Sequence, residues 1–241
     1  MTDAVPLPAR VDPAAWAPHG AALRAYMEGD QEACLVVEDD FQRELLPVSV
    51  FFRTPEAFFP YEVRALELCR GRVLDAGAGT GCISLVLQER GHQVVAIDVV
   101  PEAVEIMRAR GVHDARQADL FALRDEQFDT VLLLMNGLGL AGTVAGLPLL
   151  LQHLHRLVAP GGQVLVDSTD VATAPPPAVP PGRYPGELQF RLEFAERRGV
   201  SFPQLYADPA LMERHARDTG WRSDVVFRGE HGSWLARLER L

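Results

Sequence analysis

A regular alternation of short apolar runs with amphipathic segments begins at Arg72 and constrains the fold more than any other feature. The apolar runs are RVLDAG, VVAIDV, ARQADL, FDTVLLLMN and QVLVDS, and the segments between most of them have helical spacing. Strands that alternate with helices in this way form a parallel sheet with helices on both faces, joined by right-handed crossovers. The sequence therefore predicts a doubly wound α/β fold whose ligand site lies at the carboxyl ends of the strands.

The first predicted strand ends in a glycine-rich loop. Asp75 is followed by Gly77, Gly79 and Gly81, and then by an amphipathic segment. Glycines at this place allow a tight turn and a close approach of the backbone to a ligand. The spacing is G-x-G-x-G, so Cys82 stands where the dinucleotide fingerprint G-x-G-x-x-G has its third glycine. The loop indicates a ligand site that matches NAD-binding loops imperfectly.

Carboxylates close the first two predicted strands. Asp75 ends the first strand, where a negative charge disfavours a pyrophosphate but suits an ammonium or sulfonium cation. Asp98 ends the second, VVAID, at the position from which the acid of such folds accepts hydrogen bonds from ribose hydroxyls. The two acids favour a ligand that combines a ribose with a positive charge.

With these residues in view, the chain resembles the class I S-adenosylmethionine-dependent methyltransferases over about residues 71–170. The matching segments, in order, are VLDAGAGTG, AIDVVPEAV, QADLF, FDTVLLLMNGLG and LHRLVAPGGQVLVDS. They look like the family's first motif, its ribose-acid motif, its adenine-contacting strand end, the strand that passes the methionine end, and the following helix-turn-strand. The resemblance implies a Rossmann-like, mostly parallel seven-stranded sheet with an N-terminal helical cap and a C-terminal antiparallel strand extension.

The resemblance also implies which residues bind S-adenosylmethionine. They lie at strand ends and are Asp75, Ala76, Gly77, Gly79, Gly81, Asp98, Val99, Asp119, Leu120, Asn136 and Gly137. Asp75, Gly77 and Gly79 are expected to face the methionine part, and Asn136 the sulfonium end. At the nucleoside end, the pair Asp98 and Val99 is expected to face the ribose hydroxyls and the adenine. The pair Asp119 and Leu120 is expected to face the adenine amine and ring.

The implied activity is transfer of the methyl group by in-line displacement at the sulfonium. Positioning and desolvation can supply most of this catalysis, so neither a metal nor a protein nucleophile is expected, and no catalytic residue is assigned. His153 and His155 stand two apart on a predicted helix, which places them on different faces and disfavours a metal site. Residues 167–170 follow a central strand at the ligand edge and are a candidate to orient the acceptor.

A small-molecule acceptor is favoured over a macromolecule. The net charge of −10 argues against a nucleic-acid surface, which needs clustered cations. Methylases of amino groups carry Asn or Asp followed by Pro-Pro and an aromatic residue at the fourth strand, and the sequence Asn136-Gly-Leu-Gly departs from that pattern. Two alternatives stay open: a nicotinamide-dependent oxidoreductase, and a module that binds S-adenosylmethionine without turnover.

The rest of the chain predicts accessory elements around this core. Residues 1–70 are expected to form a cap or arm, with a helix before Gly29. Residues 34–53 are expected to form a short hairpin or an extended arm around the polar turn Asp39-Asp40. A second helix is expected from Thr54 to about Cys69. Residues 71–241 form the predicted methyltransferase domain, in which the Pro-rich stretch 172–186 is expected to be a linker or lid.

No apolar run approaches the ~18 residues of a membrane span, and the N-terminus lacks the pattern of a secretory signal. A soluble, cytoplasmic protein without a membrane partner is therefore expected.

Overall fold

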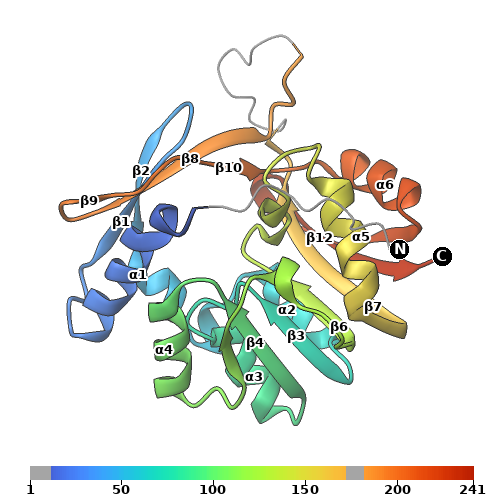
Figure 1. Ribbon diagram of the computed structural model, residues 1–241, viewed down its shortest axis with the longest axis horizontal. Coiled ribbons are helices and arrows are strands. Elements are labelled where there is room, and N and C mark those ends of the chain that lie inside the picture. The colour runs from blue at the N-terminus through green and yellow to red at the C-terminus, as the bar shows by residue number, and fades with distance from the viewer. Residues whose placement is uncertain (1–11, 172–181) are drawn as a thin grey trace.

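A seven-stranded sheet forms the centre of the protein in the computed structural model, which describes residues 12–171 and 182–241 (Figure 1). The strand order is β11-β12-β7-β6-β3-β4-β5. Its strands are β3 (Arg72–Ala76), β4 (Gln93–Asp98), β5 (Ala115–Gln117), β6 (Phe128–Leu133), β7 (Val158–Thr169), β11 (Trp221–Arg228) and β12 (Ser233–Arg240). β3 to β7 pair in parallel, whereas β12 runs antiparallel to both β7 and β11. The predicted doubly wound fold and its antiparallel C-terminal extension are confirmed.

Helices cover both faces of this sheet because its strands are apolar on both sides. The helices are α2 (Pro60–Leu68), α3 (Cys82–Glu89), α4 (Pro101–Arg110), α5 (Leu147–Leu157) and α6 (Pro209–Asp218). Val73 and Leu132 pack towards α2 and α3, whereas the neighbouring Leu74 and Val131 pack towards α5 and α6. This alternation of side chains places one apolar core on each side of the sheet.

A second, antiparallel sheet lies over the carboxyl ends of the parallel strands, and we call it the roof sheet (Figure 1). It comprises β1 (Cys34–Glu38), β2 (Arg43–Pro47), β8 (Glu187–Phe194), β9 (Arg197–Arg198) and β10 (Phe202–Leu205). The order is β10-β8-β1-β2, with β9 paired to β8. Of the two forms expected for residues 34–53, the structure has the hairpin, but it ends at Pro47, and Val48–Phe52 form a 3₁₀ helix. Its turn is held by Asp39 Oδ1, which accepts from the backbone N–H of Phe41 and Gln42.

The roof sheet combines strands from the N-terminal arm with strands from the C-terminal part of the chain. Val37 of β1 lies opposite Leu192 of β8. Segments from both sides of the proposed domain boundary at residue 70 therefore contribute strands to this sheet. The boundary itself stays a prediction. Of the Pro-rich stretch, residues 172–181 lie outside the described residues.

The predicted helix from Thr54 to Cys69 is shorter than expected. Residues Pro55–Ala57 form a single 3₁₀ turn, Phe58 and Phe59 are extended, and α2 begins only at Pro60. Pro60 explains the difference, because a residue that precedes proline is pushed out of the helical region and into extended conformations.

The predicted N-terminal helix is α1 (Pro13–Met27), which begins at the capping residue Asp12 and packs between the roof sheet and α4. Asp12 Oδ1 accepts from the backbone N–H of Ala14 at 2.9 Å. Arg24 lies 3.0 Å from Glu105 and 3.8 Å from Glu102 on α4. In the part of the chain that the structure describes, no helix is long and apolar enough to cross a membrane.

Candidate functional site

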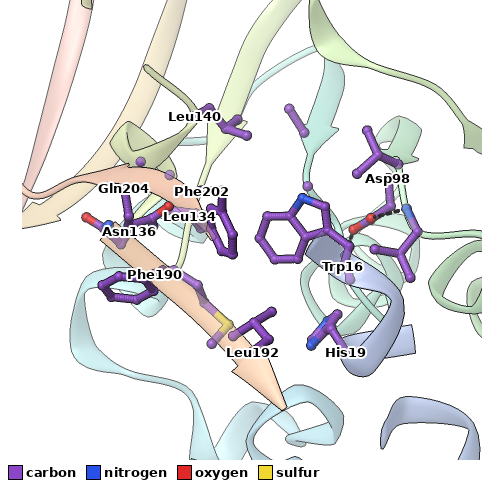
Figure 2. A pocket seen from close by; sticks show the side chains of 18 of the residues that line it. Trp16, His19, Asp98, Leu134, Asn136, Leu140, Phe190, Leu192, Phe202 and Gln204 are labelled. Atoms are coloured by element: carbon purple, nitrogen blue, oxygen red, sulfur yellow. Dashed lines mark hydrogen bonds between the residues drawn. The ribbon is translucent and has the colours of Figure 1, made fainter. Parts of the chain in front are cut away.

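A cavity of about 1670 Å³ lies between the carboxyl ends of the parallel strands and the roof sheet (Figure 2). Every predicted cofactor residue except Gly81 lines it. A site for one small ligand usually measures roughly 300–1,000 Å³. The cavity is therefore large enough for two ligands side by side.

The three glycines of the loop after β3 have two different surroundings. Gly77 and Gly79 have φ angles of +75° and +56°, and apart from their chain neighbours no described residue has a heavy atom within 4 Å of the place where a Cβ would stand. A Cβ on Gly81, by contrast, would lie 2.7 Å from Val112 Cγ2. Gly77 and Gly79 thus leave open space on the cavity side. Gly81 instead allows the start of α3 to pack closely against Val112, which follows α4.

Asp98 is fixed in place by the backbone at the end of β4. Its Oδ2 accepts from the N–H of Gly79 and its Oδ1 from the N–H of Val100, both at 2.9 Å. Burial raises the pKa of Asp98 to about 6, against the opposing effect of these hydrogen bonds. The glycine loop and the β4 end are thereby joined through one carboxylate, whose remaining lone pairs are available to a ligand.

Asp75 is buried beneath the same loop. Its Oδ2 accepts from Ser84 Oγ at 2.6 Å, and burial raises its pKa to about 6. The negative charges of Asp98 and Glu62 act in the same direction. A buried carboxylate with negative neighbours favours a cation nearby, which agrees with the charge expected for the ligand.

The segment after β5 supplies the other two residues expected at the nucleoside. Asp119 Oδ1 accepts from the N–H of Phe121 at 2.9 Å and so begins the short 3₁₀ turn η3 (Leu120–Ala122). The carbonyl oxygen of Leu120 lies 2.8 Å from His153 Nε2. His153 therefore has a structural hydrogen bond here, and it does not share a site with His155, which bonds Thr219 O.

The loop after β6 turns sharply at Asn136, whose φ is +57°. The backbone N–H groups of Asn136 and Gly137 both donate to Asp167 at 2.9 Å. The Asn136 side chain donates to Leu205 O at 3.2 Å and accepts from Ser168 Oγ at 2.9 Å. Asn136 is therefore fixed by neighbouring protein groups on both sides of its amide.

Among residues 167–170, which were expected to orient the acceptor, Asp167 is the most deeply buried residue that lines the cavity. It is 4 % exposed, and burial raises its pKa to about 7 despite the two backbone hydrogen bonds. It holds the β6 loop in its left-handed turn. A carboxylate with this pKa is also able to exchange a proton near neutral pH.

Arg53 also lines the cavity, although it was not among the residues expected at the site. Its Nη2 lies 2.5 Å from Glu62 Oε1, and its guanidinium stacks 4.0 Å from the centre of the Phe59 ring. Its side chain is 10 % exposed, and its buried Nε and Nη1 have no hydrogen-bond partner among residues 12–171 and 182–241. Two unpartnered guanidinium nitrogens beside a cavity suit an anionic ligand group such as a carboxylate.

The inner face of the roof sheet is apolar, with a few polar groups. Alternate residues of β8 face the cavity, namely Leu188, Phe190 and Leu192. The ring of Phe190 lies 6.2 Å from that of Phe202 and 6.0 Å from that of Tyr206. The cavity thus has a polar floor at the strand ends and an apolar, aromatic roof.

The comparisons with known proteins agree with this geometry. The family model "Methyltransferase domain" matches residues 74–166. A crystal structure of an S-adenosylmethionine-dependent methyltransferase from Bacteroides fragilis, in complex with S-adenosylhomocysteine, is 36 % identical with a TM-score of 0.86. That similarity covers 96 % of this chain and 98 % of the other. The chain belongs to the S-adenosylmethionine-dependent methyltransferases. Its cofactor is S-adenosylmethionine, and the nicotinamide alternative has no support.

More distant similarities concern parts of the chain or the fold alone. The ubiquinone biosynthesis O-methyltransferase of Xanthomonas oryzae is 30 % identical over 116 residues, 45 % of this chain and 47 % of that protein. This chain thus matches about half the length of that curated relative. The CcbJ methyltransferase from Streptomyces caelestis is 15 % identical with a TM-score of 0.60, over 78 % of this chain and 99 % of the other. It shares the fold.

The residues present fit this cofactor. The open Cβ positions of Gly77 and Gly79 leave room for it beside the backbone, and Asp98 presents fixed acceptors for hydroxyl groups. The orphaned nitrogens of Arg53 match the carboxylate that the methionine part carries. The assignment of individual residues to parts of the cofactor stays a prediction.

Proposed function

We propose that this enzyme methylates a small molecule that binds beneath the roof sheet, next to the cofactor. The observation that carries the proposal is the continuity of the cavity, which joins the strand-end residues to the apolar roof face. Its volume exceeds what one ligand usually requires. An acceptor with an apolar body would bury that body against Leu188, Phe190 and Phe202 and present its nucleophilic atom to the strand ends.

The proposed cofactor placement follows the polar floor. Asp98 accepts hydrogen bonds from the ribose hydroxyls. The methionine part of the cofactor passes over Gly77 and Gly79, and Arg53 binds its carboxylate. When bound, S-adenosylmethionine supplies a methyl group on a sulfonium, which is already activated as an electrophile. The protein's part is to align the acceptor with the methyl group and to keep water out, and both follow from enclosure between the two sheets.

The charge of the lining is consistent with a neutral or cationic acceptor. Asp39, Glu44 and Asp167 line the cavity, and the two free nitrogens of Arg53 are assigned to the carboxylate of the cofactor. The relatives point to small organic acceptors: the Xanthomonas oryzae protein is named for ubiquinone biosynthesis and for O-methylation. A hydroxyl or amine acceptor has a proton to lose, and we assign its uptake to Asp167, which lines the cavity and whose pKa burial raises to about 7.

The test is a methyl-transfer assay with S-adenosylmethionine labelled in the methyl group. The purified enzyme is incubated with panels of small alcohols, phenols and amines, and in parallel with protein and RNA fractions. We expect label in small molecules and release of S-adenosylhomocysteine, both absent in Gly79→Val. Label found only in macromolecules would overturn the proposed acceptor class, and binding of cofactor without any release would favour a non-catalytic module.

A further inference from the structure

Helix α1 lies against the segment that holds Asp98. A Cβ on Gly20 would stand 3.1 Å from Val100 Cγ1 and 2.3 Å from Glu102 Oε2, so the helix backbone approaches the start of α4 closely. Val100 is the residue whose N–H binds Asp98 Oδ1. The cavity-facing residues of α1 include Trp16 and His19. α1 therefore forms a wall of the cavity beside the carboxylate expected to bind ribose.

His19 is a buried polar side chain on the cavity wall. It is 9 % exposed, it lines the cavity, and its ring nitrogens make no hydrogen bond to any described residue. Its ring meets that of Phe51 edge to face at 4.6 Å. The carbonyl oxygen of Phe51 accepts from Thr80 Oγ1, next to Gly79. His19 thus contacts Phe51, which in turn accepts a hydrogen bond from the glycine loop.

Trp16 stands between the nucleoside side and the roof. Its ring lies 4.9 Å from that of Phe202, and in Figure 2 it projects into the cavity with Phe202 on one side and Asp98 on the other. Its indole N–H has no acceptor among the described residues. An aromatic face at this place can cover a planar or sugar-like group bound against Asp98.

The hydrogen-bonding capacities of His19 and Asp98 are complementary. Burial lowers the pKa of His19 to about 4, so its ring is neutral near pH 7, with one N–H donor and one acceptor. An ionised Asp98 only accepts. A ribose hydroxyl that donates to Asp98 keeps its own lone pairs, and these need a donor such as the His19 N–H.

We propose that α1 forms the second half of the adenosine site, in which His19 hydrogen-bonds a ribose hydroxyl and Trp16 packs over the nucleoside. This inference rests on the cofactor placement proposed above. A bound nucleoside gives the unpartnered His19 ring a hydrogen-bond partner, which a purely structural histidine in this apolar cluster would lack. The N-terminal helix thereby becomes part of the cofactor site.

The test measures binding of S-adenosylhomocysteine, adenosine, 2′-deoxyadenosine and 3′-deoxyadenosine by isothermal titration. The variants are His19→Phe, which keeps an aromatic ring without its nitrogens, and Trp16→Ala. Trp16→Phe and His19→Asn serve as milder replacements, and thermal unfolding checks that each variant is folded. Tyr26→Ala is the matched control, because Tyr26 stacks on Phe52 from the same helix without lining the cavity.

We expect His19→Phe to weaken S-adenosylhomocysteine and adenosine by the same factor, about tenfold for a hydrogen bond to a neutral group. The effect should vanish for the deoxyadenosine that lacks the hydroxyl His19 binds. Trp16→Ala should weaken all four ligands, and Tyr26→Ala none.

Wild-type affinity for every ligand in the folded His19 and Trp16 variants would overturn the inference. An equal loss with all four ligands in His19→Phe would overturn the hydrogen bond. Asp98→Ala separates the two proposals: if it weakens binding while the α1 variants do not, only the inference about α1 fails. If the wild-type protein does not bind S-adenosylhomocysteine at all, the cofactor placement fails with it.

Discussion

The floor and the roof of the cavity are built in opposite ways. On the floor, carboxylates are held by backbone N–H groups: Asp98 by Gly79 and Val100, and Asp167 by Asn136 and Gly137. On the roof, alternate apolar residues of β8 face the cavity, and charged residues such as Arg191 and Glu193 occupy the positions between them.

Under the proposed function, the two sides of the cavity recognise different ligands. A cofactor with fixed charges and hydroxyls needs polar groups at fixed positions, and backbone hydrogen bonds supply that rigidity. An acceptor held mainly by apolar contact needs a matching shape, which side chains of an antiparallel face can provide. We therefore expect substitutions on the floor to act on cofactor affinity and substitutions on the roof to spare it.

The largest expected effect is that of Gly79→Val. A valine there would project into the cavity and would also be strained at a φ of +56°. We expect affinity for S-adenosylhomocysteine to fall by more than about 100-fold, measured by isothermal titration, since the side chain fills space that the ligand needs. Gly91→Val is the matched control, because Gly91 has a φ of +87°, no atoms around its Cβ position and no place in the cavity lining. Equal binding loss in both variants would assign the effect to strain.

A smaller effect is expected at Asp98. Asp98→Asn should reduce affinity for S-adenosylhomocysteine by roughly 10- to 100-fold at pH 7.5, because a charged acceptor for the ribose hydroxyls is lost.

The pH dependence of binding sharpens this prediction. With the pKa of Asp98 raised to about 6, the carboxylate is ionised above that pH and protonated below it. Wild-type affinity should therefore rise from pH 5 to pH 7, by roughly tenfold, and the rise should be smaller in Asp98→Asn. Asp75, with a similar pKa, accounts for the part that remains. An unchanged pH profile in Asp98→Asn would contradict the role given to this carboxylate.

The smallest effect on the cofactor is expected from the roof. Leu188→Ala removes a buried side chain and should lower the free energy of unfolding by about 2 kcal/mol, measured by urea denaturation. Cofactor affinity should stay within about twofold of wild type, and Leu188→Met should be nearly neutral in both measurements. A tenfold loss of cofactor affinity in Leu188→Ala would show that floor and roof are not separable.

The pattern of the sequence was sufficient for the floor but not for the roof. The apolar runs predicted five parallel strands, and the glycine loop and Asp98 were placed at the strand ends because turn chemistry and strand direction are local properties. A short hairpin or extended arm was also predicted over residues 34–53, but its pairing with β8 was not, since Val37 and Leu192 are brought together only by folding. The helix expected from Thr54 was misplaced because the effect of Pro60 on the preceding residues was not weighed.

The sequence by itself determined the doubly wound core, the family and the position of the glycine loop after β3, because periodicity and glycine spacing can be read from consecutive residues. Only the tertiary structure decided that two distant segments form one roof and that His19 is buried beside the cavity. It also decided that two nitrogens of Arg53 find no partner in the described part of the chain. The physical reason is that the hydrophobic pattern of a helix or strand indicates which of its faces is apolar. Which residues contact one another, and which polar groups keep no partner, depends on how the helices and strands pack together.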